Sequence, residues 1–197
     1  AQSRRVAEIF KMRYMDESGF LDEDDIDLEI KCLYHLLQVD QNRGKVISKK
    51  WGDVLRWFGP IKDNNGYPGF LGRIKRVLKL PYFHGPLSEK SALHSLRNER
   101  VGSFLLRFSG KPGAFSLSYV TPEERVAHRR FYFCPNDNAF FKFNHQKFYS
   151  IQALLGAFQK QNIIIDGKES SVYRCLFDSS KSGNNYIVDE DHDFMEE

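Results

Sequence analysis

The sequence predicts an α+β fold, in which a central antiparallel sheet is flanked by two helices and follows an all-α helical segment. The runs 103–109 and 114–120 are short, apolar and bounded by Gly or Pro, a pattern typical of strands joined by a tight loop. The run 126–133 alternates from one face to the other, as a further strand does. Apolar stripes at helical spacing lie on both sides of these strands, at 22–58 and 150–160.

Length and composition narrow the classes of protein. The 197 residues suit one or two domains, and 41% apolar residues are enough for a core. A net charge of +3 gives little reason to expect nucleic acid or an anionic membrane as partner. The three cysteines show no zinc spacing and suit a reducing compartment. Without an apolar span or a signal core, we expect a soluble protein of the cytoplasm, with the nucleus as a second location.

The first 80 residues are expected to form a helical domain. Apolar periodicity predicts helices at 3–15, 22–38, 48–58 and 70–79. In the last of these, the basic residues are expected to point outward: Arg73, Lys75, Arg76 and Lys79.

The helix-loop-helix at 22–58 invites comparison with a calcium-binding EF-hand. An EF-hand loop needs glycine at its sixth position and a bidentate glutamate at its twelfth. Counted from Asp40, these positions hold Lys45 and Trp51. We therefore expect a structural helical pair without a metal ion.

Residues 81–177 are expected to contain the sheet and its two helices. In chain order, we predict a short strand at 82–84, a helix capped by Ser88, strands at 103–109, 114–120, 126–133 and 140–143, and a helix at 150–160. The strand at 103–109 is apolar on both faces, so we expect it to be central and covered on both sides.

Arg107 stands in the middle of this apolar strand, on the face of Leu105 and Ser109. An arginine there cannot lose its charge and needs a partner anion. The strand, the loop 110–112 and the facing run 113–120 contain no acidic residue. The anion could belong to a ligand, or it could be internal, from Glu89, Glu123 or Glu124 in a domain that binds nothing.

Residues 104–109, FLLRFS, resemble the signature strand of Src-homology-2 (SH2) domains and are close to its version in STAT proteins. The opening YFHG at 82–85 and the helix start SIQALL at 150–155 are similar to the family in the same order, so the resemblance covers about 81–176. The helical segment before them is similar to the EF-hand-like segments of STAT and Cbl proteins. The resemblance implies a phosphotyrosine-binding signalling module whose partner is a tyrosine-phosphorylated protein or peptide, with no cofactor.

By this resemblance, Arg107 grips two oxygens of the phosphate with its planar fork. The other implied phosphotyrosine-binding residues are Ser109, Lys111, Ser116, His128, Arg130 and Lys90. His128 could equally be a satisfied core histidine.

Glu89 departs from the family, because many members have arginine at its position and STAT proteins have lysine. A carboxylate facing the phosphate would repel it. Either Glu89 turns away and Lys90 serves, or affinity is reduced, or Glu89 is the internal partner of Arg107 in a structural scaffold.

Peptide selectivity is expected from residues beside the sheet. Arg129 would favour acidic residues just after the phosphotyrosine, and Phe141, Phe143 and Ile164 would shape an apolar cleft. The run 163–165 could instead close the core.

Residues 178–197 are expected to form an acidic C-terminal tail. Tyr186 lies there beside apolar and acidic residues and is a candidate phosphorylation site. Once phosphorylated, it could bind the same domain of another copy and form a homodimer, as in a STAT-like transcription factor. The alternative is an edge strand or a disordered tail.

Two other function classes are less favoured. The chain has no phosphatase loop, Walker loop, HExxH motif or glycine-serine elbow, so we expect no enzyme. Nucleic-acid binding would rest on the basic residues of 70–79, and would predict steep salt dependence and tolerance of Arg107→Ala.

Overall fold

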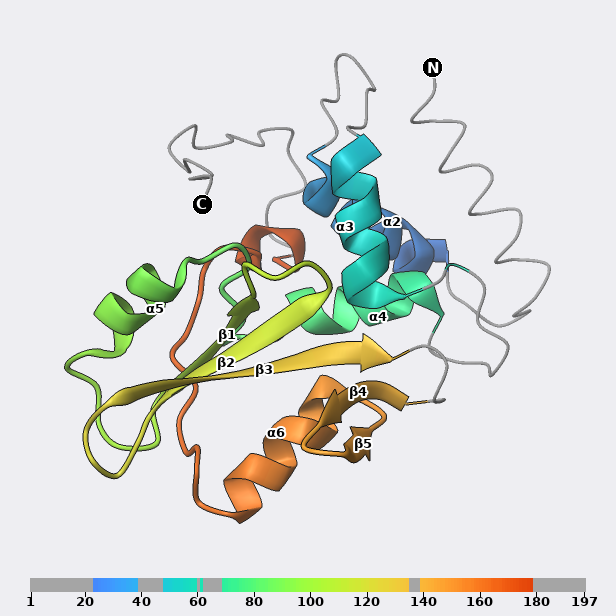
Figure 1. The fold of residues 1–197 in the computed structure, drawn as a ribbon. Helices are drawn as coiled ribbons and strands as arrows, with labels where there is room; N and C mark the ends of the chain where they lie inside the picture. Colours follow the sequence, from blue (N-terminus) through green and yellow to red (C-terminus); the bar gives the residue numbers. More distant parts are fainter. Residues whose placement is uncertain (1–22, 39–47, 60, 62–68, 135–138, 179–197) are drawn as a thin grey trace.

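The computed structural model describes residues 23–38, 48–59, 61, 69–134 and 139–178 (Figure 1). Its helices are α2 (Glu23–Leu37), α3 (Ser48–Phe58), α4 (Phe70–Leu78), α5 (Glu89–Leu96) and α6 (Ile151–Lys160), with a 3-10 turn η2 (Arg174–Leu176). Its strands are β1 (Phe104–Phe108), β2 (Ala114–Val120), β3 (Val126–Cys134), β4 (Ala139–Phe143) and β5 (Gln146–Phe148). This arrangement confirms the predicted α+β class.

Two helices of the sheet-containing part begin at serine caps. The Ser88 hydroxyl accepts a hydrogen bond from the amide of Ser91 at 3.0 Å, and the Ser150 hydroxyl accepts one from the amide of Ala153 at 3.0 Å. Each bond satisfies an amide that has no partner within the first helical turn. The predicted cap at Ser88 is thereby confirmed.

The sheet is antiparallel throughout, in the order β1-β2-β3-β4-β5. Its register pairs Arg107 with Ser116, and Ser116 with Arg130. Paired residues on neighbouring strands point to the same face, so this register puts the three side chains on one side of the sheet.

The last strand, β5, was missed by the sequence analysis. Asn144 and His145 connect it to β4 with positive φ angles of 45° and 65°, the backbone of a two-residue hairpin turn. Because neither residue is glycine and β5 itself is largely polar, the sequence carries only a weak signal for this hairpin.

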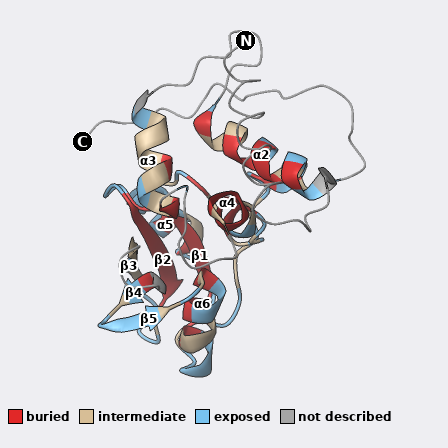
Figure 2. Cartoon of the chain, turned by 90° about the vertical axis from the view of Figure 1, so that its right-hand side faces the viewer, coloured by how far each residue is buried: buried red, intermediate tan, exposed pale blue. Residues whose placement is uncertain are grey.

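Strand β1 ends the sheet rather than lying at its centre, which corrects one prediction. Its outer edge is nevertheless covered: the His84 amide donates to the Leu106 carbonyl at 2.8 Å, and the Phe104 amide donates to the Asp166 carbonyl at 2.9 Å. The expected strand at 82–84 is reduced to one parallel bridge between Phe83 and Leu106. All five β1 residues are buried, as the apolar pattern predicted (Figure 2).

The two faces of the sheet differ in what covers them. One face contributes most of its aromatic residues to a large core, which is closed by α6 and by the N-terminal helices (Figure 1). The other face, below α5, has a small apolar cluster formed by Ala92, Leu96, Leu105 and Val120. The polar residues of the strands share this second face.

Arg73 points inward, so the prediction that it faces outward is wrong. It is only 7% exposed, its Nε donates to the Phe58 carbonyl at 2.7 Å, and its guanidinium lies 5.4 Å from the centre of the Phe133 ring. The last carbonyls of a helix have no partner within it, so the C-terminal end of α3 favours a cation. Lys75 of α4 is half-buried, with its Nζ 3.1 Å from Glu29 and 3.3 Å from Asp25.

Some expectations fall outside the described residues: the helix at 3–15, most of the loop compared with an EF-hand, and the tail with Tyr186. Within the described ranges, no helix has the length and apolarity to cross a membrane. The same ranges contain no group of three or more His, Cys, Asp or Glu residues that could hold a metal ion.

We expect Phe115→Ala to lower the free energy of unfolding by about 3 to 5 kcal/mol, because it leaves a cavity in the aromatic core. Phe115 is fully buried and contacts the rings of Phe58, Phe108, Phe131 and Phe141. Urea denaturation measures the effect. Tyr149→Ala, at a residue 70% exposed, is the control and should change stability by about 0.5 kcal/mol or less. Equal stabilities of the two variants would contradict this account of the core.

Candidate functional site

A strip of polar side chains crosses the α5 face of the sheet. Its members alternate along three adjacent strands: Arg107 on β1, Ser116 and Ser118 on β2, and His128 and Arg130 on β3. The alternation of strand side chains brings them together, although they are up to 23 positions apart in the sequence. Four residues predicted from the sequence therefore lie together on one face of the sheet, and Ser118, which was not predicted, lies among them.

Arg107 is the buried cation of this strip, with 2% of the residue exposed. Its Nη1 donates to the carbonyls of Leu87 at 3.2 Å and Phe108 at 3.3 Å, and its Nε donates to the Ser118 hydroxyl at 3.3 Å. Within the described chain, Nη2 makes no hydrogen bond. Burial lowers the pKa of Arg107, but from an ordinary value so high that the guanidinium stays charged.

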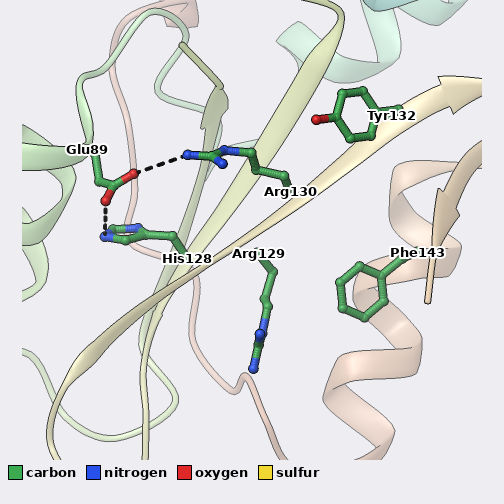
Figure 3. Close-up of a pocket in the computed structure, with 6 residues that line it drawn as sticks. All are labelled: Glu89, His128, Arg129, Arg130, Tyr132 and Phe143. Atoms are coloured by element: carbon green, nitrogen blue, oxygen red, sulfur yellow. Dashed lines mark ion pairs between the residues drawn. The ribbon is translucent and has the colours of Figure 1, made fainter. Parts of the chain in front are cut away.

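Glu89, the first residue of α5, faces this cation rather than turning away. Its Oε2 lies 3.7 Å from Nη2 of Arg107 and 3.7 Å from Nη2 of Arg130, and its Oε1 lies 4.0 Å from Nε2 of His128. Figure 3 shows the carboxylate between His128 and Arg130. These distances are ion-pair distances, too long for hydrogen bonds. The alternative in which Glu89 points elsewhere is therefore wrong for this structure, whereas its pairing with Arg107 is observed.

Ser118 orders the two basic side chains beside it and was missed by the sequence analysis. Its hydroxyl accepts from Arg107 and shares a 2.8 Å hydrogen bond with Nδ1 of His128. With the hydroxyl proton directed to Nδ1, the imidazole carries its own proton on Nε2, the nitrogen that faces Glu89. The sequence could have indicated Ser118, because it lies two positions after Ser116 and therefore on the same face of the strand.

Ser116 is the one member of the strip whose polar atom has no partner among the described residues. It is fully buried, and its hydroxyl makes no hydrogen bond although it lies opposite both Arg107 and Arg130. A buried hydroxyl without a partner is unfavourable, so the group is available to a ligand that reaches it.

The loop between β1 and β2 borders the strip at the Arg107 end. Ser109 is buried, and its hydroxyl accepts from the Lys111 amide at 3.3 Å. Lys111 itself is exposed.

An open hollow of about 480 Å³ lies over β3 next to the strip. Six residues line it: Glu89, His128, Arg129, Arg130, Tyr132 and Phe143 (Figure 3). Arg129 points away from His128 and Arg130, because it occupies the opposite face of the strand. The hollow therefore joins the cationic strip to a region lined by Arg129 and Phe143, two of the residues predicted for selectivity. Tyr132 of β3, which was not predicted, also lines the hollow.

The remaining predicted residues lie elsewhere. Lys90 is exposed on α5 and does not line the hollow. Phe141 and Ile164 are buried in the large core, so in this structure they close the core rather than line the hollow over β3. Burial of Ile164 agrees with the alternative that the isoleucine run closes the core.

The arrangement is chemically suited to binding an anion. Arg107 and Arg130 present their guanidinium groups toward one point, and that point is held by a carboxylate that is 57% exposed. A buried cation of this kind favours an oxyanion that can accept several charge-assisted hydrogen bonds.

A comparison with protein families matches the part of the chain that contains this strip. The family model described as "SH2 domain" matches residues 82–158. The chain is 29% identical over 136 residues to the dual specificity protein kinase shkA of Dictyostelium discoideum, covering 66% of this chain and 25% of that protein. It is 31% identical over 117 residues to shkC of the same organism, covering 55% of this chain and 23% of that protein. The chain thus spans about a quarter of the length of these two relatives.

Among solved structures, the chain is similar to the SH2 domain of a CRK/CRKL homologue of Monosiga brevicollis, determined by solution NMR. The sequence identity is 24%, the match covers 46% of this chain and 84% of that one, and the TM-score is 0.38.

We expect His128 to titrate below the usual histidine range and Glu89→Gln to lower its pKa further. Burial lowers the pKa of His128, the charge of Glu89 opposes that shift, and the two arginines add to it. Because the native pKa is below that of the unfolded chain, stability from this group is lost as the pH falls below about 6.5.

Two-dimensional NMR of the imidazole protons measures this shift. Glu99→Gln, which removes a carboxylate paired with Lys168 away from the strip, is the matched control and should leave His128 unchanged. An unaltered His128 titration in Glu89→Gln would show that the carboxylate does not act on the strip in solution.

Proposed function

We propose that the SH2 domain formed by residues 82–158 binds tyrosine-phosphorylated peptides through Arg107. The domain is a binding module of a signalling protein. The partner is a protein or peptide that carries phosphotyrosine, and no cofactor or metal ion is needed for its recognition.

One observation carries the proposal: Arg107 is a buried cation whose Nη2 makes no hydrogen bond within the described chain. A phosphotyrosine carries nearly two negative charges at neutral pH and three strong acceptor oxygens. Such a group could accept from Nη2 of Arg107 and from Arg130, and could engage the unpartnered Ser116 hydroxyl. A phosphate would supply the hydrogen-bond acceptor that Nη2 of Arg107 lacks.

The depth of the site supports tyrosine over serine or threonine as the phosphorylated residue. Arg107 and Ser116 are buried on the sheet, whereas Arg130 and Tyr132, which line the hollow beside them, are exposed. A phosphate at the end of an aromatic ring reaches farther from its backbone than one on a short side chain. His128 and Arg130 would then pack beside the ring.

A second candidate function is that of a scaffold which binds no phosphate. Its support is the position of Glu89, whose carboxylate already lies 3.7 Å from Arg107 and from Arg130. In this alternative the carboxylate is the permanent partner anion of the strip. The two candidates differ in whether a phosphate can replace it.

Finer assignments remain part of the proposal. Arg129 and Phe143 line the hollow and would select residues after the phosphotyrosine. A STAT-like subtype, an EF-hand-like origin of the N-terminal helices, a homodimer through phosphorylated Tyr186, and a cytoplasmic or nuclear location are further hypotheses that rest on the resemblance alone. We propose no catalysis by the SH2 domain. The kinase names belong to relatives of which this chain spans a quarter or less.

We expect Arg107→Lys to weaken binding of a phosphotyrosine peptide by about 2 to 5 kcal/mol, which is about thirtyfold to several thousandfold. Lysine keeps the charge but cannot form the bidentate contact. Titration of fluorescent peptides by anisotropy measures the affinity, with the unphosphorylated peptide as the ligand control.

Arg97→Lys at the exposed end of α5 is the matched protein control, since it makes the same exchange outside the strip. Circular dichroism establishes that each variant is folded. Equal affinity of the native protein and Arg107→Lys would overturn the assignment of the phosphate to Arg107.

We expect Glu89→Gln to tighten phosphotyrosine binding by about threefold to thirtyfold, because it removes a negative charge from the site while keeping the shape of the side chain. The gain should shrink at high salt. A native protein that binds no phosphopeptide, together with a Glu89→Gln variant that does, would favour the scaffold. If neither binds, phosphotyrosine recognition by this strip is excluded.

A further inference from the structure

Helix α3 supports the loop that would hold the phosphate, although it precedes the residues that match the SH2 family. We define the phosphate loop as residues 109–113, between β1 and β2. In Figure 1, α3 stands at the end of the sheet where β2 begins and β3 ends. The same placement follows from the contacts of α3 with β2 and β3.

Trp57 of α3 contacts both residues that flank the phosphate loop. Its ring stacks on Phe108, just before the loop, with centroids 4.0 Å apart and planes inclined by 25°. Its indole Nε1 donates to the carbonyl of Ala114, just after the loop, at 3.1 Å. That carbonyl also accepts from the Ser109 amide at 3.0 Å, the bond that closes the loop. One side chain therefore holds both ends of the loop.

The last residue of the loop lies directly against the backbone of α3. Gly113 has a φ of +74°, and a Cβ added there would be 3.2 Å from the carbonyl oxygen and the Cβ of Arg56. Glycine is needed for this conformation and for this close approach. The loop therefore packs on α3 through its last residue, Gly113, as well as through the two residues that flank it.

The residues that Trp57 contacts are in turn bonded to groups that would bind the phosphate. The Phe108 carbonyl accepts from Nη1 of Arg107 at 3.3 Å, so the position of Phe108 influences the direction of the guanidinium. Within the loop, the Ser109 hydroxyl accepts from the Lys111 amide at 3.3 Å. A shift of Phe108 or Ala114 would therefore move the donors around the phosphate position.

We propose that Trp57 is a positioning residue for phosphotyrosine recognition, which holds the phosphate loop and Arg107 in the geometry that binds the phosphate. This inference rests on the proposed function and extends the site to a helix outside the SH2 match. Trp57 does not itself contact the ligand. Its effect passes through Phe108 and Ala114.

The test is Trp57→Phe, which keeps an aromatic ring for stacking and removes the indole donor. Loss of one such hydrogen bond should weaken binding of a phosphotyrosine peptide by about twofold to tenfold. Amide hydrogen exchange of Ser109 and Lys111 in the free protein should become faster by a similar factor. Ile74→Val is the matched control, because it removes one buried methyl group from α4, a helix that packs on α2 and α3.

The control separates positioning from general loss of stability. Thermal melting should show that Ile74→Val is destabilised at least as much as Trp57→Phe, yet it should keep native affinity and native loop exchange. Affinity and loop exchange that are the same in Trp57→Phe and Ile74→Val would overturn the inference, as would faster loop exchange with unchanged affinity.

If the native protein binds no phosphotyrosine peptide, the proposed function fails, and hydrogen exchange then decides whether Trp57 holds the loop. Faster exchange of Ser109 and Lys111 in Trp57→Phe than in Ile74→Val would support that contact. Equal exchange rates in the two variants would exclude it.

Discussion

The charge of Arg107 is the constraint on which the site is built. A guanidinium in a buried strand must have acceptors around it, and the carbonyls of Leu87 and Phe108 together with the Ser118 hydroxyl supply them. These acceptors direct the remaining nitrogen, Nη2, toward the start of α5. These hydrogen bonds offset most of the free-energy cost of burying the cation, and they leave Nη2 facing a position that an anion can occupy.

One face of the sheet forms the large core that stabilises the fold, and the other face carries the polar strip. The aromatic face packs on α6 and on the N-terminal helices, and this large core makes the strands rigid. The opposite face has only a small apolar cluster, which leaves room for the polar strip. Because each strand alternates its side chains, rigidity on one face fixes the positions of charges on the other. The helices before the SH2 domain therefore contribute to the geometry of a site that lies on the far side of the sheet.

Glu89 makes this strip different from one that is simply cationic. Its carboxylate faces Arg107, Arg130 and His128 and partly neutralises them before any ligand arrives. Since the side chain is more than half exposed, solvent screens these pairs and the carboxylate can be displaced at modest cost. A phosphate that enters would exchange one anion for another of higher charge. Affinity is then set by the difference between the two, rather than by the attraction of the cations alone.

Strands β1 to β3, the helix capped by Ser88 and the need of Arg107 for an anion could be predicted from the sequence alone, because each follows from a period of two, a local cap or a charge that cannot be lost. The sequence also placed His128 and Arg130 on one face. Three features depend on how the helices pack on the sheet: Glu89 faces the strip, Arg73 points inward, and Trp57 donates to a carbonyl 57 residues away. Such contacts join segments that are distant in the chain, and no local pattern encodes which of several side chains will meet when the helices pack on the sheet.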